Sequence, residues 1–229
     1  MSKVKIYAGV MATACAVLAM NAGSALAEGK GTIRIAENDW TGQLVDINLA
    51  KIILSEHMGY DVELVFADYT GQWAGLASGD LDVGMELWPS LEVESVREWV
   101  HEKGKVEILG DLGVVATAGW FVPTYMIKGD SERGIEPMTP DLVSYEQLNK
   151  YASLFARTET GDKGFCLDSV PTWELHNEDR IKNLGLNFVN VFAGTEGSLV
   201  AEIQAAYEKG DPLLICNMWE PHWLMAALD

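Results

Sequence analysis

Basic residues are scarce in this sequence. The 229 residues include 16 Lys and Arg against 34 Asp and Glu, which gives a formal net charge of -18 at pH 7. This balance argues against binding to nucleic acid or to anionic membrane surfaces, and it is compatible with cationic or zwitterionic ligands. Solubility is an alternative reason for most of the charge. The length suffices for a sizeable core and for two small domains.

Groupings typical of enzymes are also missing. The histidines are scattered: His57, His101, His176 and His222. No two of them have metal-ligand spacing, and no nucleophile motif is present. Asp80 and Asp82 form a pair of carboxylates, but they flank the start of a predicted strand, where capping or solvent exposure explains them. We therefore predict a protein that is not an enzyme and needs no metal or other cofactor.

Long apolar runs are absent except at the N-terminus. There, Lys3 and Lys5 precede an apolar, charge-free run over residues 6–20, and Ala-Leu-Ala follows at 25–27. This pattern predicts a cleaved signal peptide at residues 1–27 and export to a periplasm. A membrane anchor is the alternative, but the run is short for a span. Cys15 follows Ala-Thr-Ala, which is a poor lipid-attachment signal.

Two cysteines, Cys166 and Cys216, remain after the signal peptide. Each lies at the end of an apolar run that we interpret as a strand. Disulfides persist in an exported protein, so a bridge is expected if these strands are neighbours. Two buried thiols are the alternative, and the sequence leaves both open.

One construction occurs twice in the chain. The sequence GDLDVGMELWP spans residues 79–89, and GDPLLICNMWEP spans 210–221. In both, a helix-like segment ends at Gly-Asp, an apolar run follows, and Trp lies nine residues after the Gly, with Pro close behind. The pattern predicts a strand with Trp at its carboxyl end and Pro where a helix can begin. Two such Trp-bearing sheet edges facing each other would form a cleft.

Predicted strands and helices alternate along the chain. The strands are expected at 32–37, 62–67, 81–87, 165–168, 187–192 and 213–219, and the helices at 41–58, 71–77, 92–103, 144–157, 173–183 and 194–209. Thr41 is the expected N-cap of the first helix. This alternation of strands and helices predicts an α/β protein with mainly parallel sheets flanked by helices. We expect it to form two lobes, at residues 28–118 and 119–229.

Tryptophans gather at the predicted ligand edge, since ligands of such sheets bind beyond the carboxyl ends of the strands. Trp40, Trp88, Trp173 and Trp219 all fall there. Any single Trp is more often a packing residue. Aromatic faces around a void, however, attract a quaternary ammonium group, and free N–H groups where helices begin suit a carboxylate. Betaines carry both groups.

The sequence resembles the glycine betaine, proline betaine and choline substrate-binding proteins of ABC transporters. The resemblance rests on GDLDV (79–83), LWP (87–89), VPTY (122–125) and WEPHW (219–223). It implies a type II periplasmic-binding-protein fold and a cage of Trp88, Trp173 and Trp219. It further implies that the main-chain N–H groups of Glu174 and Leu175 hold a ligand carboxylate.

Choline-binding relatives add a Trp after the first strand, here Trp40, followed by an Asp for the choline hydroxyl. This chain has Gly42 where that Asp would be, and Ala118 where those relatives place a Tyr. Both departures favour glycine betaine. Some betaine binders also use a His toward the carboxylate; Glu92 occupies the nearest position, and His222 is the substitute candidate, with helix capping or packing as its alternative role.

The resemblance also implies a monomer that delivers its ligand to a membrane permease driven by an ATPase. Members of this family normally continue beyond the position of Asp229 and return to the first lobe. The first lobe is therefore expected to be incomplete, with an exposed sheet edge and apolar surface. The alternatives are a choline or carnitine binder, or a binder of an amino acid or taurine, although the latter sites rely on Arg or Lys.

Overall fold

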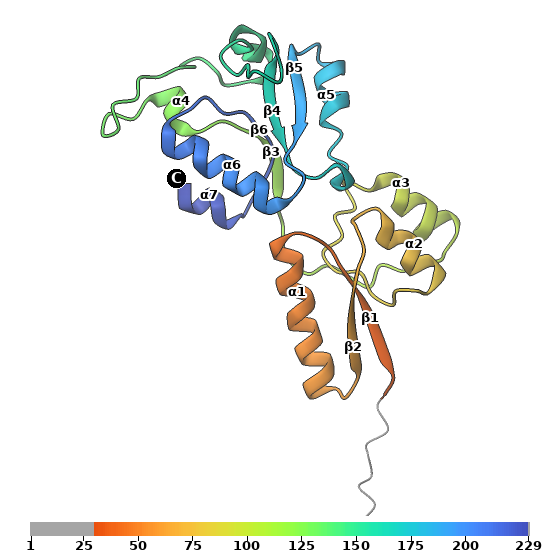
Figure 1. Ribbon diagram of the computed structural model, residues 1–229. Helices are drawn as coiled ribbons and strands as arrows, with labels where there is room; N and C mark the ends of the chain where they lie inside the picture. The colour runs from red at the N-terminus through yellow and green to blue at the C-terminus, as the bar shows by residue number, and fades with distance from the viewer. Residues whose placement is uncertain (1–29, 229) are drawn as a thin grey trace, which may run out of the picture.

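The computed structural model describes residues 30–228, which fold into two lobes (Figure 1). The first lobe contains β1 (Thr32–Glu37), α1 (Thr41–Ile52), η1 (Ile53–His57), β2 (Asp61–Phe66), α2 (Gly71–Ser78), α3 (Val93–Ser95) and η2 (Val96–Glu102). The second contains β3 (Thr117–Phe121), α4 (Thr124–Lys128), η3 (Tyr145–Tyr151), β4 (Gly164–Asp168), η4 (Pro171–Trp173), α5 (Asn177–Asn183), β5 (Phe188–Phe192), α6 (Glu196–Lys209), β6 (Ile215–Glu220) and α7 (Trp223–Leu228). The predicted limit at residue 118 lies within β3, and the predicted signal peptide lies outside the described residues.

A two-stranded parallel sheet is the framework of the first lobe. β1 pairs with β2 from Thr32 opposite Asp61 to Glu37 opposite Phe66. The strand predicted at 81–87 is wrong, because only Val83 forms a bridge, to Ile35. Three residues later the backbone of Glu86 adopts φ 57°, in the left-handed region, which ends any extended strand.

Helix α1 begins one residue earlier than its predicted cap implies. Trp40, not Thr41, is the N-cap, and its side chain makes no capping hydrogen bond. Thr41 is the first helical residue instead. The helix continues beyond Ile52 as the π-helical segment η1 before the chain turns at Gly59, whose φ of 77° suits a glycine.

The second lobe has a four-stranded sheet of order β3-β6-β4-β5. Strand β4 is parallel to both of its neighbours, β6 and β5, whereas β3 runs antiparallel to β6. The predicted helix at 144–157 is a 3₁₀ helix over Tyr145–Tyr151 only. Tertiary contacts hold this segment, since the Asn149 side chain accepts from Asn187 N–H at 2.7 Å and donates to the Gly185 carbonyl at 3.0 Å.

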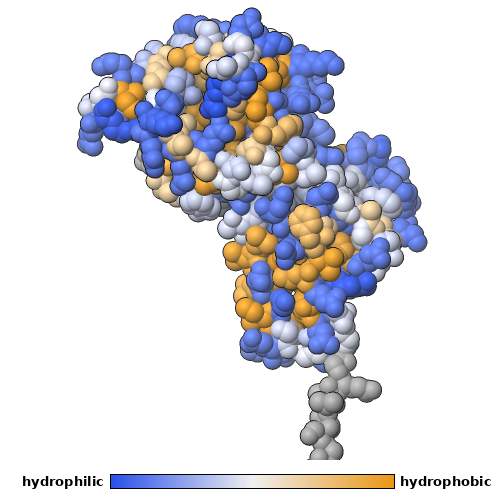
Figure 2. Space-filling view, viewed as in Figure 1, coloured by the Kyte–Doolittle hydropathy of each residue, from blue (hydrophilic) through white to orange (hydrophobic). Residues whose placement is uncertain are grey.

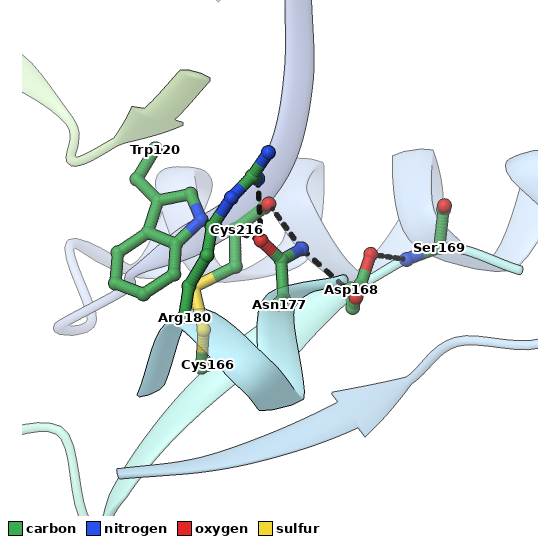
Figure 3. The surroundings of a disulfide bond; sticks show 7 residues. All are labelled: Trp120, Cys166, Asp168, Ser169, Asn177, Arg180 and Cys216. Atoms are coloured by element: carbon green, nitrogen blue, oxygen red, sulfur yellow. Dashed lines mark hydrogen bonds between the residues drawn. A yellow bond between two sulfur atoms is a disulfide. The ribbon is translucent and has the colours of Figure 1, made fainter. Parts of the chain in front are cut away.

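A disulfide joins Cys166 of β4 to Cys216 of β6, which decides the alternative left open by the sequence. Beside it lies the buried side chain of Asn177 (Figure 3). Its amide N–H groups donate to Asp168 Oδ2 at 2.9 Å and to the Cys216 carbonyl at 2.7 Å. Asn177 Oδ1 in turn accepts from the Trp120 indole N–H at 2.8 Å. This network fixes α5 against the two strands that the disulfide joins.

The first lobe carries the apolar surface that the sequence led us to expect. Val45 and Leu49 on α1 are 61% and 55% exposed, and Phe66 at the end of β2 is 69% exposed. Figure 2 shows apolar side chains gathered over this part of the lobe. Within residues 30–228, no helix combines the length and the apolar character that crossing a bilayer requires.

Candidate ligand-binding site

A cavity of about 120 Å³ lies where the two lobes meet, and aromatic side chains dominate its walls. The lining residues are Trp40, Tyr69, Glu86, Trp88, Ser90, Leu91, Ala116, Ala118, Trp173, Leu175, Asn217 and Trp219. Each of the four tryptophans singled out from the sequence is therefore part of this wall. Ala118, which the sequence also singled out, lines it as well.

The tryptophans reach the cavity because each follows or ends an extended segment. Trp40 comes shortly after β1 and caps α1, while Trp173 lies in η4 just after β4. Trp219 is the second-last residue of β6, and Trp88 follows the short bridge at Val83. Trp40, Trp173 and Trp219 thus lie at the carboxyl ends of strands, as the rule for ligands of α/β sheets predicts, whereas Trp88 follows an isolated bridge and not the predicted strand.

The rings form a continuous series of edge-to-face contacts across the lobes. The Trp40 ring centroid lies 5.5 Å from that of Tyr69 and 5.8 Å from that of Trp173. Trp173 in turn lies 5.8 Å from Trp219. The rings of these three pairs are steeply inclined to each other, with interplanar angles of 68–81°. Ring faces as well as ring edges therefore point toward the surroundings. Ring faces are electron-rich and favour a cation, so the walls suit a positively charged apolar group.

Tyr69 fixes the backbone of Trp88. Its hydroxyl accepts from the Trp88 N–H at 2.8 Å and donates to the Trp88 carbonyl at 3.3 Å. Burial raises the pKa of Tyr69, so the phenol stays protonated and can donate at neutral pH. The sequence analysis missed this residue, although it follows β2 and the same strand-end rule would have found it.

Two polar contacts join the lobes beside the cavity. The Trp173 indole N–H donates to Asp39 Oδ1 at 2.8 Å. Glu196, at the start of α6, accepts at Oε2 from the Thr41 N–H at 2.9 Å and from the Thr41 hydroxyl at 2.6 Å. A carboxylate of the second lobe therefore binds the N-terminus of α1 in the first, where the helix dipole favours negative charge.

Residues 31–229 match the family model described as the substrate-binding domain of the ABC-type glycine betaine transport system. The chain belongs to this family. Its members are transporter substrate-binding domains, which confirms the prediction that the protein is not an enzyme.

Solved structures share the fold of this family member. Lactococcal OpuAC, in a closed conformation with glycine betaine, is 19% identical with a TM-score of 0.65, over 86% of this chain and 68% of that one. An ABC-transporter choline-binding protein with choline is 18% identical with a TM-score of 0.67, over 86% and 62%. The glycine betaine/L-proline-binding protein ProX from Borrelia burgdorferi is 19% identical with a TM-score of 0.62, over 86% and 66%.

These likenesses confirm the type II periplasmic-binding-protein fold predicted from the sequence. The chain spans 68%, 62% and 66% of the length of the three structures. At such identities they establish the architecture, and the ligand must be argued from the residues of this family member itself.

The side chain of His222 does not line the cavity. Its Nδ1 accepts from the Leu224 N–H at 3.2 Å, and its Nε2 lies 3.4 Å from Glu196 Oε1. A proton on Nε2 with Nδ1 as the acceptor satisfies both contacts. The sequence-based assignment of His222 to the ligand stays a prediction, and the structure gives its nitrogens other partners.

The two predicted carboxylate-binding amides differ. The Glu174 N–H donates to the Pro171 carbonyl at 3.3 Å, closing the 3₁₀ turn of η4, and Glu174 is not among the residues that line the cavity. Leu175 lines the cavity, and its N–H has no acceptor among residues 30–228. The amide pair expected for a ligand carboxylate therefore offers a single free donor in this family member.

Proposed function

We propose that this protein is the exported solute-binding component of an ABC importer and that it binds a quaternary ammonium compound in the cavity between its lobes. The observation that carries the proposal is the wall of Trp40, Trp88, Trp173 and Trp219 around a small cavity. A trimethylammonium group donates no strong hydrogen bond and is held by ring faces, each contact contributing about 0.5 to 2 kcal/mol.

The composition of the lining disfavours other solutes. Amino acid and sulfonate ligands carry an anionic group that needs a strong cationic partner, yet the lining contains no Lys, Arg or His. A primary ammonium group also needs several hydrogen-bond acceptors, whereas most of this wall is aromatic or aliphatic. Choline, carnitine and glycine betaine all satisfy the aromatic part of the site.

The family supports the transport role. A substrate-binding domain of this kind closes around its ligand by hinge motion and delivers it to a membrane permease that an ATPase drives. The contacts of Glu196 with Thr41 and of Trp173 with Asp39 link the two lobes next to the cavity, as closure around a ligand requires.

Calorimetric titration with choline, glycine betaine and their primary amine counterparts, ethanolamine and glycine, tests this proposal. We expect binding of a quaternary compound without binding of the primary amines. Trp88→Ala and Trp219→Ala should each lower the affinity at least tenfold, because each removes one aromatic wall. Trp99→Ala is the matched control, since Trp99 stacks against Lys103 outside the cavity. Wild-type affinity in both cavity variants would contradict the aromatic cage.

A further inference from the structure

Among residues 30–228, Glu86 is the only charged side chain that lines the cavity. Its Oε2 atom is inaccessible to solvent and makes no hydrogen bond of normal geometry, although the indole N–H groups of Trp40 and Trp88 interact with the carboxylate. No salt bridge to Glu86 exists within residues 30–228. Glu86 as a whole is half-buried, but a carboxylate oxygen shielded from water without a counter-charge is unfavourable, and native structures retain one chiefly where a ligand or a function compensates for it. Its position beside the aromatic rings makes a cationic ligand the natural partner.

Two features of the backbone hold this carboxylate in place. Glu86 adopts φ 57°, a left-handed conformation that is unfavourable for a residue with a side chain. Its carboxylate also lies directly over Gly42: a Cβ atom at that position would be 3.1 Å from Oε2 and 3.2 Å from Oε1. The missing side chain at position 42 thus leaves the space that the Glu86 carboxylate occupies.

The charges around Glu86 act together on its protonation. Burial raises the pKa of Glu86, and the carboxylates of Asp46 and Glu196 raise it further, while the indole N–H groups of Trp40 and Trp88 act in the opposite direction. A nearby cation favours the ionised carboxylate and would lower this pKa again. Cation binding and ionisation of Glu86 are therefore expected to favour each other.

We propose that the Glu86 carboxylate is the counter-ion of the bound ammonium group, and that it selects quaternary ammonium cations such as choline over zwitterions such as glycine betaine. This inference rests on the proposed function and names its ligand class. A cation with Glu86 makes a neutral pair inside the cavity. A zwitterion would add a second carboxylate to a lining that holds one already and has no basic residue, which is unfavourable at short range. This ligand differs from the glycine betaine expected from the sequence, and the titrations described next decide between the two.

Choline and glycine betaine make a matched pair of ligands, because both carry a trimethylammonium group and differ in a hydroxymethyl against a carboxylate. In calorimetric titrations, the wild-type protein should bind choline at least tenfold more tightly than glycine betaine. Glu86→Gln, which keeps the side-chain shape and removes the charge, should weaken choline binding at least tenfold and leave glycine betaine binding unchanged or tighter. Circular dichroism on the same samples establishes that each variant is folded.

Two further variants complete the design. Glu92→Gln is the matched control, because Glu92 also has a solvent-inaccessible carboxylate oxygen without a hydrogen-bond partner, but it does not line the cavity. Its choline affinity should stay within threefold of wild type. Gly42→Ala keeps the charge and makes the Glu86 carboxylate shift slightly, so it should weaken choline binding less than Glu86→Gln does. If Glu86→Gln fails to fold, the preference of the wild-type protein between choline and glycine betaine gives the decision.

The pH dependence gives a readout that shape alone would not produce. Because burial raises the pKa of Glu86, protonation of this carboxyl group competes with cation binding at a higher pH than it would for an exposed glutamate. Choline affinity should rise as the pH increases through this raised pKa, and Glu86→Gln should abolish the dependence. Glycine betaine binding tighter than choline, or equal losses in Glu86→Gln and Glu92→Gln, would overturn the counter-ion role while leaving the proposed function intact. A folded wild-type protein that binds no quaternary compound would overturn the proposed function itself.

Discussion

Removal of the Glu196 carboxylate should weaken ligand binding without touching the cavity. Glu196→Ala leaves the Thr41 N–H and hydroxyl without the acceptor that lies 2.9 and 2.6 Å away in the wild-type protein. Glu196 is only 8% exposed, so solvent screens these bonds little. A hydrogen bond to a charged group contributes about 1.5 to 3 kcal/mol, and part of this is regained when the lobes separate and water solvates Thr41. We expect the closed arrangement to lose about 2 kcal/mol, which corresponds to roughly 30-fold in affinity if binding requires closure.

Calorimetry with choline measures the affinity, and small-angle scattering of the ligand-free protein measures the separation of the lobes. Glu202→Ala is the matched control. Its carboxylate lies on the same helix but contacts Arg157 of the second lobe, so its effect on affinity should stay within twofold. A Glu196→Ala protein that binds choline within twofold of wild type, with unchanged scattering, would refute the view that this contact stabilises closure.

Acid should weaken the same contact. Burial, the largest influence, raises the pKa of Glu196, but the hydrogen bonds with His222 and Thr41 together bring it below its usual value of 4.5. A carboxyl group whose pKa is depressed in the folded protein contributes stability above its ordinary pKa and loses it as the pH falls through the lowered value. Closure should therefore weaken below about pH 4.5 in the wild type and should lack this dependence in Glu196→Ala.

Two further substitutions test the support of the site. Tyr69→Phe removes both hydrogen bonds to the Trp88 backbone. Thermal unfolding should therefore show a loss of about 1 to 2 kcal/mol in the free energy of unfolding, and calorimetry should show a lower ligand affinity. Wild-type values in both measurements would contradict the role of Tyr69 in fixing Trp88. The double variant Cys166→Ser with Cys216→Ser opens a loop of 50 residues, and urea titration should show a loss of about 4 kcal/mol. A loss below about 1 kcal/mol would show that the bridge contributes little.

Local sequence signals predicted those elements of the fold whose residues are paired or buried throughout. β4 is fully buried and β1 carries Ile35 and Ala36 in the core, so apolar pattern and strand coincide. The apolar run at 81–87 gave the same signal, but the left-handed backbone at Glu86 ends the extended segment, and nothing in the residue type announces that conformation. The disulfide could not be decided either, because it depends on β4 and β6 being neighbours in the sheet.

The aromatic part of the site was predictable because it follows from a positional rule about strand ends. Trp88 and Trp219 also share a repeated motif, which made them visible in the sequence. The role of Glu86 was not predictable, because its carboxylate occupies the space above Gly42. This is a contact between residues far apart in the chain. The role of His222 was not predictable either: its ring does lie beside the cage, with its centroid 4.7 Å from that of Trp219, but the fold gives its nitrogens Glu196 and Leu224 as partners.

The row of rings across the cavity gives the molecule an optical property of its own. Within residues 30–228, the contact of Trp40 with Trp173, at 5.8 Å and 78°, is the one aromatic pair that joins the two lobes. Indoles this close couple their electronic transitions, and the coupling vanishes once the rings move apart. Opening of the lobes would therefore change the near-ultraviolet dichroism and the intrinsic fluorescence together, so that ligand capture and release can be followed in real time in the unlabelled protein.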